Sequence, residues 1–167
     1  MDFSKYYNLE QYLFTDVRNK FNSNGFLDAK DFFCIVIWKA NRAKTNIKKK
    51  LIKVNGNLDK AVRFLTEEIF LAKNKEEKLD VLLKKWKFGL PMATAILTVL
   101  YPNEFSVYDY RVREQIGLPN ISTGKKYFLD FLPKVQESPH GQCLRDKDKY
   151  LWGKSFYEDL NKLVCSD

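Results

Sequence analysis

Asp109 is the residue of this sequence whose setting best suits chemistry. It follows an extended run, residues 105–108, and precedes a short helix-forming stretch, residues 110–116, for which it is the expected N-cap. An aspartate there accepts backbone N–H bonds and lies near the positive end of the helix dipole, which favours the ionised carboxylate. Such a carboxylate can stabilise a cationic, oxocarbenium-like transition state. The alternative is that Asp109 only caps its helix.

The corner formed by residues 88–91 is a second candidate site. Gly89 can adopt a positive φ and so turn the chain, and Pro91 suits the first position of the following helix, where its missing N–H costs nothing. The free N–H groups of that helix start lie close in sequence to Lys85 and Lys87. Together they are suited to binding an anion such as a DNA phosphate.

Cysteine and histidine give no support to other kinds of site. Cys34, Cys143 and Cys165 are far apart and form no CxxC pair, which argues against a zinc knuckle, an iron–sulfur loop or a disulfide framework. His140, the one histidine, follows a proline in a predicted loop with no motif around it, which argues against a Ser-His-Asp or Cys-His system. We therefore expect no metal site and no small-molecule cofactor.

The chain is basic, with 29 Lys and Arg against 21 Asp and Glu, a formal net charge of +8 and a pI near 9.3. Such an excess fits a polyanion partner, with nucleic acid the commonest and an anionic membrane surface second. A lysine-rich solvated surface explains the charge equally well.

Residues 41–53 are the most basic stretch and predict a short helix with a cationic face. That face can follow a phosphate backbone, or it can be a solvated helix surface. The aromatic residues expected of a single-strand binding platform are missing from the stretch, which favours the solvated surface.

Length and composition indicate a single globular domain over residues 1–167. Of the residues, 45% are hydrophobic and 15% aromatic, enough for a large core, and 7 Gly and 5 Pro are few for a sandwich or barrel. The sequence shows no signal peptide and no run long enough to span a membrane, so we expect a soluble cytoplasmic protein without membrane contact.

Helical periodicity and capping residues recur along the chain. The expected helices span residues 3–22, 28–41, 41–53, 57–72, 75–87, 92–101, 110–116 and 122–132, with a last helix from Asp146 onward. Ser122 is the expected cap of the eighth, and Pro133 is expected to bend or end it. Residues 32–38 also fit a buried strand, because three β-branched residues follow one another there, but the helical neighbours favour a helix.

Residues 88–112, FGLPMATAILTVLYPNEFSVYDYRV, resemble the helix–hairpin–helix and aspartate segment of the HhH-GPD DNA glycosylase superfamily. In that superfamily a hairpin with two spaced glycines leads into a Thr-Ala-containing helix, and a catalytic aspartate follows. Gly89 matches the first hairpin glycine, and Thr94 with Ala95 matches the helix start. Asp109 matches the catalytic aspartate.

The chain is also similar to uncharacterised bacterial proteins that share the pattern ATAILT…P…F.V.D.RV. Those proteins have a late Arg-Asp…Asp…Leu-Trp element, which corresponds here to residues 144–152, LRDKDKYLW. Three positions depart from the superfamily pattern. Pro91 replaces the second hairpin glycine, Tyr108 stands where valine is usual, and Ala93 stands where bifunctional members carry a lysine nucleophile.

The resemblance implies an all-α, helix–hairpin–helix DNA-glycosylase-like domain, with the hairpin and aspartate segment at residues 75–117. It implies a DNA repair protein that resembles a monofunctional base glycosylase, acts on double-stranded DNA and uses Asp109 as its catalytic residue. The implied DNA-binding residues are Lys85, Lys87, Phe88, Gly89, Leu90, Met92, Thr94 and Arg111.

A glycosylase also needs a pocket for the base that it removes. Because such enzymes flip the base out of the duplex, rings should line this pocket, and the candidates are Phe32, Phe33, Trp38 and Tyr108. Two alternatives stay open. One is a DNA-binding module with the same fold and no catalysis, and the other is a structural helical protein that binds a protein partner.

Overall fold

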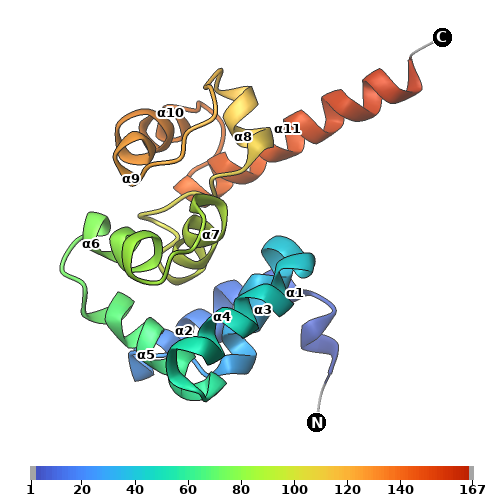
Figure 1. Cartoon of the computed structure of the whole chain (residues 1–167). Helices are drawn as coiled ribbons and strands as arrows, with labels where there is room; N and C mark the ends of the chain where they lie inside the picture. Colours follow the sequence, from blue (N-terminus) through green and yellow to red (C-terminus); the bar gives the residue numbers. More distant parts are fainter. Residues whose placement is uncertain (1–2, 166–167) are drawn as a thin grey trace.

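The structure is a computed structural model that describes residues 3–165, and over this range it is helical without any β-strand (Figure 1). The all-α prediction is confirmed. The strand alternative for residues 32–38 is wrong, since they belong to α3. Within the same range, no helix is both long and apolar enough to cross a bilayer.

Five helices form the N-terminal part of the chain. They are α1 (Leu9–Tyr12), α2 (Arg18–Asn24), α3 (Ala29–Ala40), α4 (Lys44–Asn55) and α5 (Leu58–Leu71). A π-helical turn, Leu13–Val17, joins α1 to α2, and 3-10 turns lie at Ser4–Tyr6 and Asn41–Ala43.

The remaining helices are α6 (Lys75–Asp80), α7 (Leu90–Leu100), α8 (Tyr110–Gln115), α9 (Gly124–Lys126), α10 (Leu132–Gln136) and α11 (Leu144–Val164). Two further π-helical turns, Val81–Lys85 and Tyr127–Phe131, extend α6 and connect α9 to α10. Figure 1 shows α7 in the middle of the molecule, the N-terminal helices on one side of it and α8 to α11 on the other, with the end of α11 projecting from the body.

Three expected boundaries are wrong, each for a local reason. The last helix begins at Leu144 rather than at Asp146, because Asp146 is the third residue of a capping box and accepts the Cys143 N–H. Thr123 caps α9 in place of Ser122. Pro133 does not end the helix, which continues to Gln136, because Pro133 lies in the first turn of α10, where its missing N–H is tolerated.

α7 is the most buried element of the fold. Every residue from Leu90 to Leu100 is buried except Pro91, and α7 packs against α2, α3 and α6. Ala93 and Ala95 are small enough to let neighbouring backbones approach closely. Because α7 is apolar on all sides, the other helices have to surround it.

After α7 and a turn at residues 102–104, residues 105–109 form an extended segment that has no strand partner. Three consecutive N–H groups of this segment instead donate hydrogen bonds to side chains from three different elements. Ser106 N–H donates to the Tyr127 hydroxyl (3.0 Å), Val107 N–H to the Asp148 carboxylate (3.4 Å) and Tyr108 N–H to Thr94 Oγ1 (2.9 Å). Buried N–H groups need such acceptors, so these contacts fix the position of Asp109.

Thr94→Val should destabilise the protein by about 1–3 kcal/mol, because it leaves the buried Tyr108 N–H without an acceptor. Thr98→Val is the matched control. Thr98 is equally buried in α7, but its hydroxyl only returns to the Thr94 carbonyl. Urea unfolding of both variants measures the difference, and equal losses of stability would contradict the role given to Thr94.

Candidate functional site

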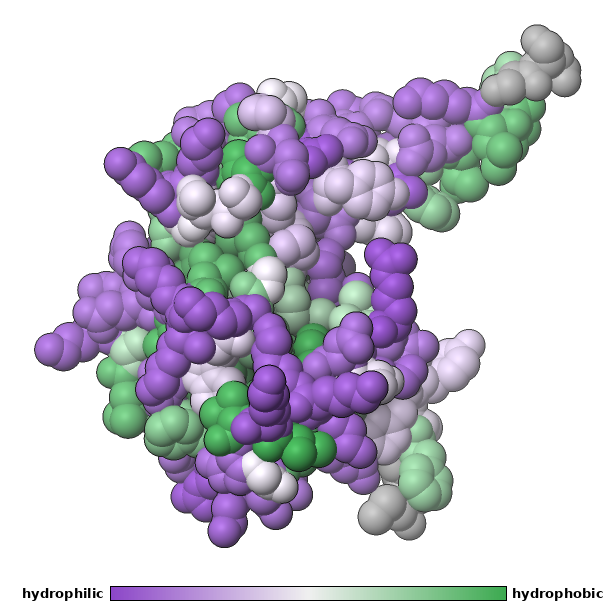
Figure 2. Space-filling view, in the orientation of Figure 1, coloured by the Kyte–Doolittle hydropathy of each residue, from purple (hydrophilic) through white to green (hydrophobic). Residues whose placement is uncertain are grey.

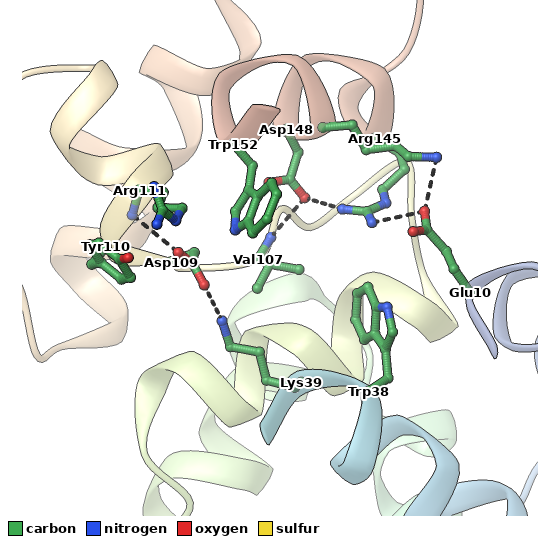
Figure 3. Close-up of a pocket in the computed structure, with 11 residues that line it drawn as sticks. Glu10, Trp38, Lys39, Val107, Asp109, Tyr110, Arg111, Arg145, Asp148 and Trp152 are labelled. Carbon is green, nitrogen blue, oxygen red and sulfur yellow. Dashed lines mark hydrogen bonds and ion pairs between the residues drawn. The ribbon is translucent and has the colours of Figure 1, made fainter. Parts of the chain in front are cut away.

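A cleft of about 570 Å³ lies between α1 and α3 on one side and α8 and α11 on the other (Figure 3). Figure 2 shows the surface hollowed between these two parts of the molecule. This volume falls within the range of about 300–1,000 Å³ that is typical of ligand pockets. The cleft is lined by Glu10, Trp38, Lys39, Val107, Asp109, Tyr110, Arg111, Arg145, Asp148, Lys149 and Trp152.

Asp109 lies in the wall of this cleft and caps α8, as its sequence position predicts. Its Oδ1 accepts the Arg111 N–H (3.1 Å), which satisfies one of the free N–H groups of the helix start. Its Oδ2 accepts a hydrogen bond from the Lys39 ammonium (2.5 Å), which reaches across from α3. The Asp109 side chain is 17% exposed and that of Lys39 14%, so this ion pair is largely shielded from water.

Aromatic rings form much of the remaining wall. Trp38 comes from α3, Tyr110 from α8 and Trp152 from α11. The Arg111 guanidinium lies 5.1 Å from the ring centre of Tyr110 and 5.5 Å from that of Trp152, and it pairs with Asp159 (2.6 Å). Rings and planar cations of this kind stack well on flat heterocycles.

The opposite end of the cleft holds a group of charges centred on Arg145. The Arg145 guanidinium pairs with Asp148 (2.6 Å) and with Glu10 (3.0 Å), and Lys149 also pairs with Glu10 (2.9 Å). The same guanidinium lies 5.4 Å from the centre of the Trp38 ring. Since Glu10 belongs to α1, these pairs tie the first helix of the chain to the last.

Burial and charge act in opposite directions on the two carboxylates of this group. Burial raises the pKa of Asp148, and the Arg145 guanidinium with the Val107 N–H offsets this rise only in part. Partial burial would also raise the pKa of Glu10, but the contacts of Lys149 and Arg145 outweigh it and leave that pKa below its ordinary value. The same guanidinium therefore acts on two carboxylates whose pKa values are shifted in opposite directions.

The late sequence element at residues 144–152 meets Asp109 in this cleft. Arg145, Asp148, Lys149 and Trp152 follow one another at helical spacing on one face of α11, and that face lines the site. Two sequence motifs that are more than thirty residues apart in the chain thus contribute to one cavity.

The expected DNA-binding residues are divided between the cleft and the rest of the molecule. Only Arg111 lines the cleft. The side chains of Phe88, Leu90, Met92 and Thr94 are buried in the core, where they cannot touch a ligand on the surface. Lys85, Lys87 and Gly89 are exposed, and Lys85 pairs with Glu68.

The residue with a positive φ at the corner before α7 is not the expected glycine. Gly89 is extended, with φ −74° and ψ 152°, and the left-handed residue is Lys87, with φ 54°. The Met92 and Ala93 N–H groups both bond to the Gly89 carbonyl, which leaves fewer free donors at the start of α7 than the sequence predicts.

Lys39 and Glu10 are the functional candidates that the sequence analysis missed. No motif surrounds either residue, and each reaches the site only because α1 and α3 pack beside the C-terminal helices. Of the rings expected in a base pocket, Trp38 lines the cleft, whereas Phe32, Phe33 and Tyr108 do not. Tyr108 instead donates its hydroxyl to Asn120 Oδ1 (2.9 Å).

Over residues 3–165, no three His, Cys, Asp or Glu side chains are grouped closely enough to hold a metal ion. No protein-family model, curated protein or solved structure matches this chain.

The Lys39–Asp109 pair should contribute to stability in a way that a double-mutant cycle detects. In a cycle of Lys39→Met and Asp109→Asn we expect a coupling of about 0.5–3 kcal/mol, because either single change leaves a shielded charge without its partner. The control is the Lys84–Asp80 pair, whose side chains are 75% and 41% exposed and should couple by at most about 0.5 kcal/mol. Unfolding in urea measures both cycles, and similar couplings would contradict the shielding of the cleft pair.

The raised pKa of Asp148 predicts a pH-dependent effect of Asp148→Asn. Between the ordinary value of 3.8 and the raised value, the folded wild type binds more protons than the unfolded chain, so its stability falls as the pH rises. The variant lacks this group. The free energy of unfolding of the variant, relative to that of the wild type, should therefore increase as the pH rises through this window and become constant above it. Unfolding measured from pH 4 to 8 tests this, and a difference that is constant or decreases would refute it.

Proposed function

We propose that this protein is a DNA-associated hydrolase that cleaves N-glycosidic bonds, with Asp109 as its catalytic residue. The supporting observation is that the Asp109 carboxylate, held at the start of α8, opens into a ring-lined cleft large enough for a nucleotide base. A carboxylate that only capped its helix would have no need of such a cavity. The partner in this proposal is double-stranded DNA, and the proposal implies a cytoplasmic repair protein with a helix–hairpin–helix fold.

The chemistry assigned to the cleft needs a base taken out of the duplex. Trp38, Tyr110 and Trp152 supply faces on which the flipped base stacks. As the bond to the sugar breaks, the base leaves with the electron pair, and positive charge develops on the sugar. The Asp109 carboxylate stabilises that charge, and water then adds to the sugar carbon while its proton passes to the departing base.

Lys39 has two effects on this carboxylate. Its ammonium donates to Asp109 Oδ2 and so holds that oxygen in a fixed direction. It also neutralises part of the negative charge that a sugar cation would use. A water-based mechanism fits this arrangement, because the Lys39 nitrogen is engaged by the Asp109 carboxylate and Ala93 stands where a nucleophilic lysine would be.

The second candidate is a DNA-binding module without catalysis. One observation favours it: both carboxylate oxygens of Asp109 are already engaged, Oδ1 by the Arg111 N–H and Oδ2 by Lys39. For catalysis the Lys39 contact has to lengthen when substrate enters. In a pure binding module the contact would stay as it is.

Asp109→Asn should lower the single-turnover rate of base release by on the order of 10²–10³, because the neutral amide cannot stabilise the sugar cation. The experiment incubates the protein with duplexes that each carry one damaged or modified base, and it measures the free base and the abasic product. Asp130→Asn is the control, since Asp130 lies in the turn Tyr127–Phe131, outside the cleft.

The affinity of the same duplexes for wild type and Asp109→Asn separates the two candidates. Release by wild type that is lost in Asp109→Asn and kept in Asp130→Asn supports the hydrolase. Equal release by all three proteins, or no release from any duplex, rejects it. If binding is unchanged while release is absent throughout, the binding module is the correct function.

A further inference from the structure

The positive charge of this protein is concentrated in one segment. Residues 32–58 contain seven basic residues and no acidic one, while the net charge of the whole chain is +8. The seven are Lys39, Arg42, Lys44, Lys48, Lys49, Lys50 and Lys53. Five of them belong to α4, whereas Lys39 forms an ion pair with Asp109 in the cleft.

The five lysines of α4 are exposed, and no ion pair within residues 3–165 involves any of them. Two of them make neutral contacts: Lys44 bonds to Asn41 Oδ1 and Lys50 to the Lys87 carbonyl. Lys84 and Lys85, which precede the corner at residues 88–91, are both paired with acids. The unneutralised charge is therefore on α4 rather than on those two lysines.

α4 lies beside that corner. The Lys50 ammonium donates to the Lys87 carbonyl (2.6 Å) and lies 5.4 Å from the ring centre of Phe88. Lys87 is itself exposed and has no acidic partner in the part of the chain that the structure describes. Lys50 thus places Lys87 beside α4, and we name the exposed lysines of α4 together with Lys87 the α4 face.

We propose that the α4 face is the main surface with which this protein binds the phosphate backbone of duplex DNA. The inference rests on the proposed function for the identity of the polyanion. It reverses the expectation, drawn from the sequence, that this stretch is only a solvated helix surface. It also moves the backbone contact from Lys85 to α4.

The chemistry of α4 favours duplex DNA over the other polyanions. The apolar residues Ile47 and Leu51 are buried, and the exposed Ile52 and Val54, two positions apart, lie on opposite sides of the helix. The helix α4 therefore has no continuous apolar face of the kind that an interfacial helix inserts into a membrane. No aromatic residue occurs within residues 41–58, so this surface offers no platform for the bases of a single strand. What remains is point charge, which suits phosphates and is indifferent to base sequence.

The dimensions of α4 also suit a phosphate backbone. From Lys44 to Lys53 the helix rises about 13 Å, at about 1.5 Å per residue. Duplex DNA carries one charge per about 1.7 Å of its axis, so several phosphates lie within reach of these side chains at once. Figure 1 shows α4 on the side of α7 away from α9 and α10, so those helices do not cover it.

The test replaces three exposed lysines of α4 that make no hydrogen bond or ion pair through their ammonium groups within residues 3–165, as Lys48→Gln/Lys49→Gln/Lys53→Gln. The matched control is Lys73→Gln/Lys125→Gln/Lys126→Gln, which makes the same change of net charge at exposed lysines away from α4. Fluorescence anisotropy with a labelled 20-base-pair duplex, measured at several salt concentrations, gives the affinity and its salt dependence. Circular dichroism checks that both variants are folded.

We expect the α4 variant to bind at least tenfold more weakly than wild type at low salt. The slope of log K against log salt should be smaller by about 2–3, since each lost phosphate contact removes about 0.9. The control variant should keep the wild-type slope. Equal effects of the two triple changes overturn the proposal, because they would show that only net charge matters. Absence of DNA binding by wild type overturns it as well.

Two further measurements separate this proposal from others. Vesicles that contain phosphatidylserine test the membrane alternative, and binding to vesicles but not to duplex DNA overturns the proposal. Base release is scored independently. A reduced salt slope in the α4 variant, without base release by wild type, supports the α4 face and rejects only the hydrolase. Base release with an unchanged slope rejects only the α4 face.

Discussion

The burial of an extended segment in an all-helical protein is the constraint on which the rest of this structure depends. Residues 105–108 have no neighbouring strand, yet all four are buried, so their N–H groups need acceptors from other parts of the chain. The Phe105 N–H bonds to the Tyr101 carbonyl, and the other three need side chains. Thr94, Tyr127 and Asp148 provide these acceptors. These residues come from α7, the turn before α10, and α11, and the segment can form only when all three elements are assembled. Asp109 is therefore positioned by tertiary contacts and not by its own helix alone.

The hydrogen bonds that hold residues 106–108 are connected to the ion pairs of the cleft through Asp148. Asp148 accepts the Val107 N–H and also pairs with Arg145, which pairs in turn with Glu10. A buried carboxylate is stable only where donors surround it, and here it has both a backbone N–H and a guanidinium. Asp148 thus supports the segment before Asp109, lines the cleft and holds Arg145, the residue that links α11 to α1.

The sequence predicted the helices well because periodicity and caps are local signals. It correctly predicted Asp109 as a cap and α7 as buried, since each depends on nearby residues. It missed Lys39 and Glu10, which reach the cleft by packing between distant helices and carry no local pattern. It also predicted a positive φ at Gly89, because glycine is the usual residue for that conformation, whereas Lys87 adopts it.

Charge in this molecule is arranged differently in the cleft and on α4. In the cleft, Lys39, Arg111 and Arg145 each face a carboxylate, so they orient groups and add little net field. On α4 the lysines are exposed and face no carboxylate within the part of the chain that the structure describes, and exposed charge acts over about 8 Å at physiological salt. Because long-range attraction needs unpaired charge and orientation needs paired charge, one surface cannot serve both purposes well. In the proposed function, this separation places the attraction of a polyanion on α4 and leaves the paired charges of the cleft to position Asp109.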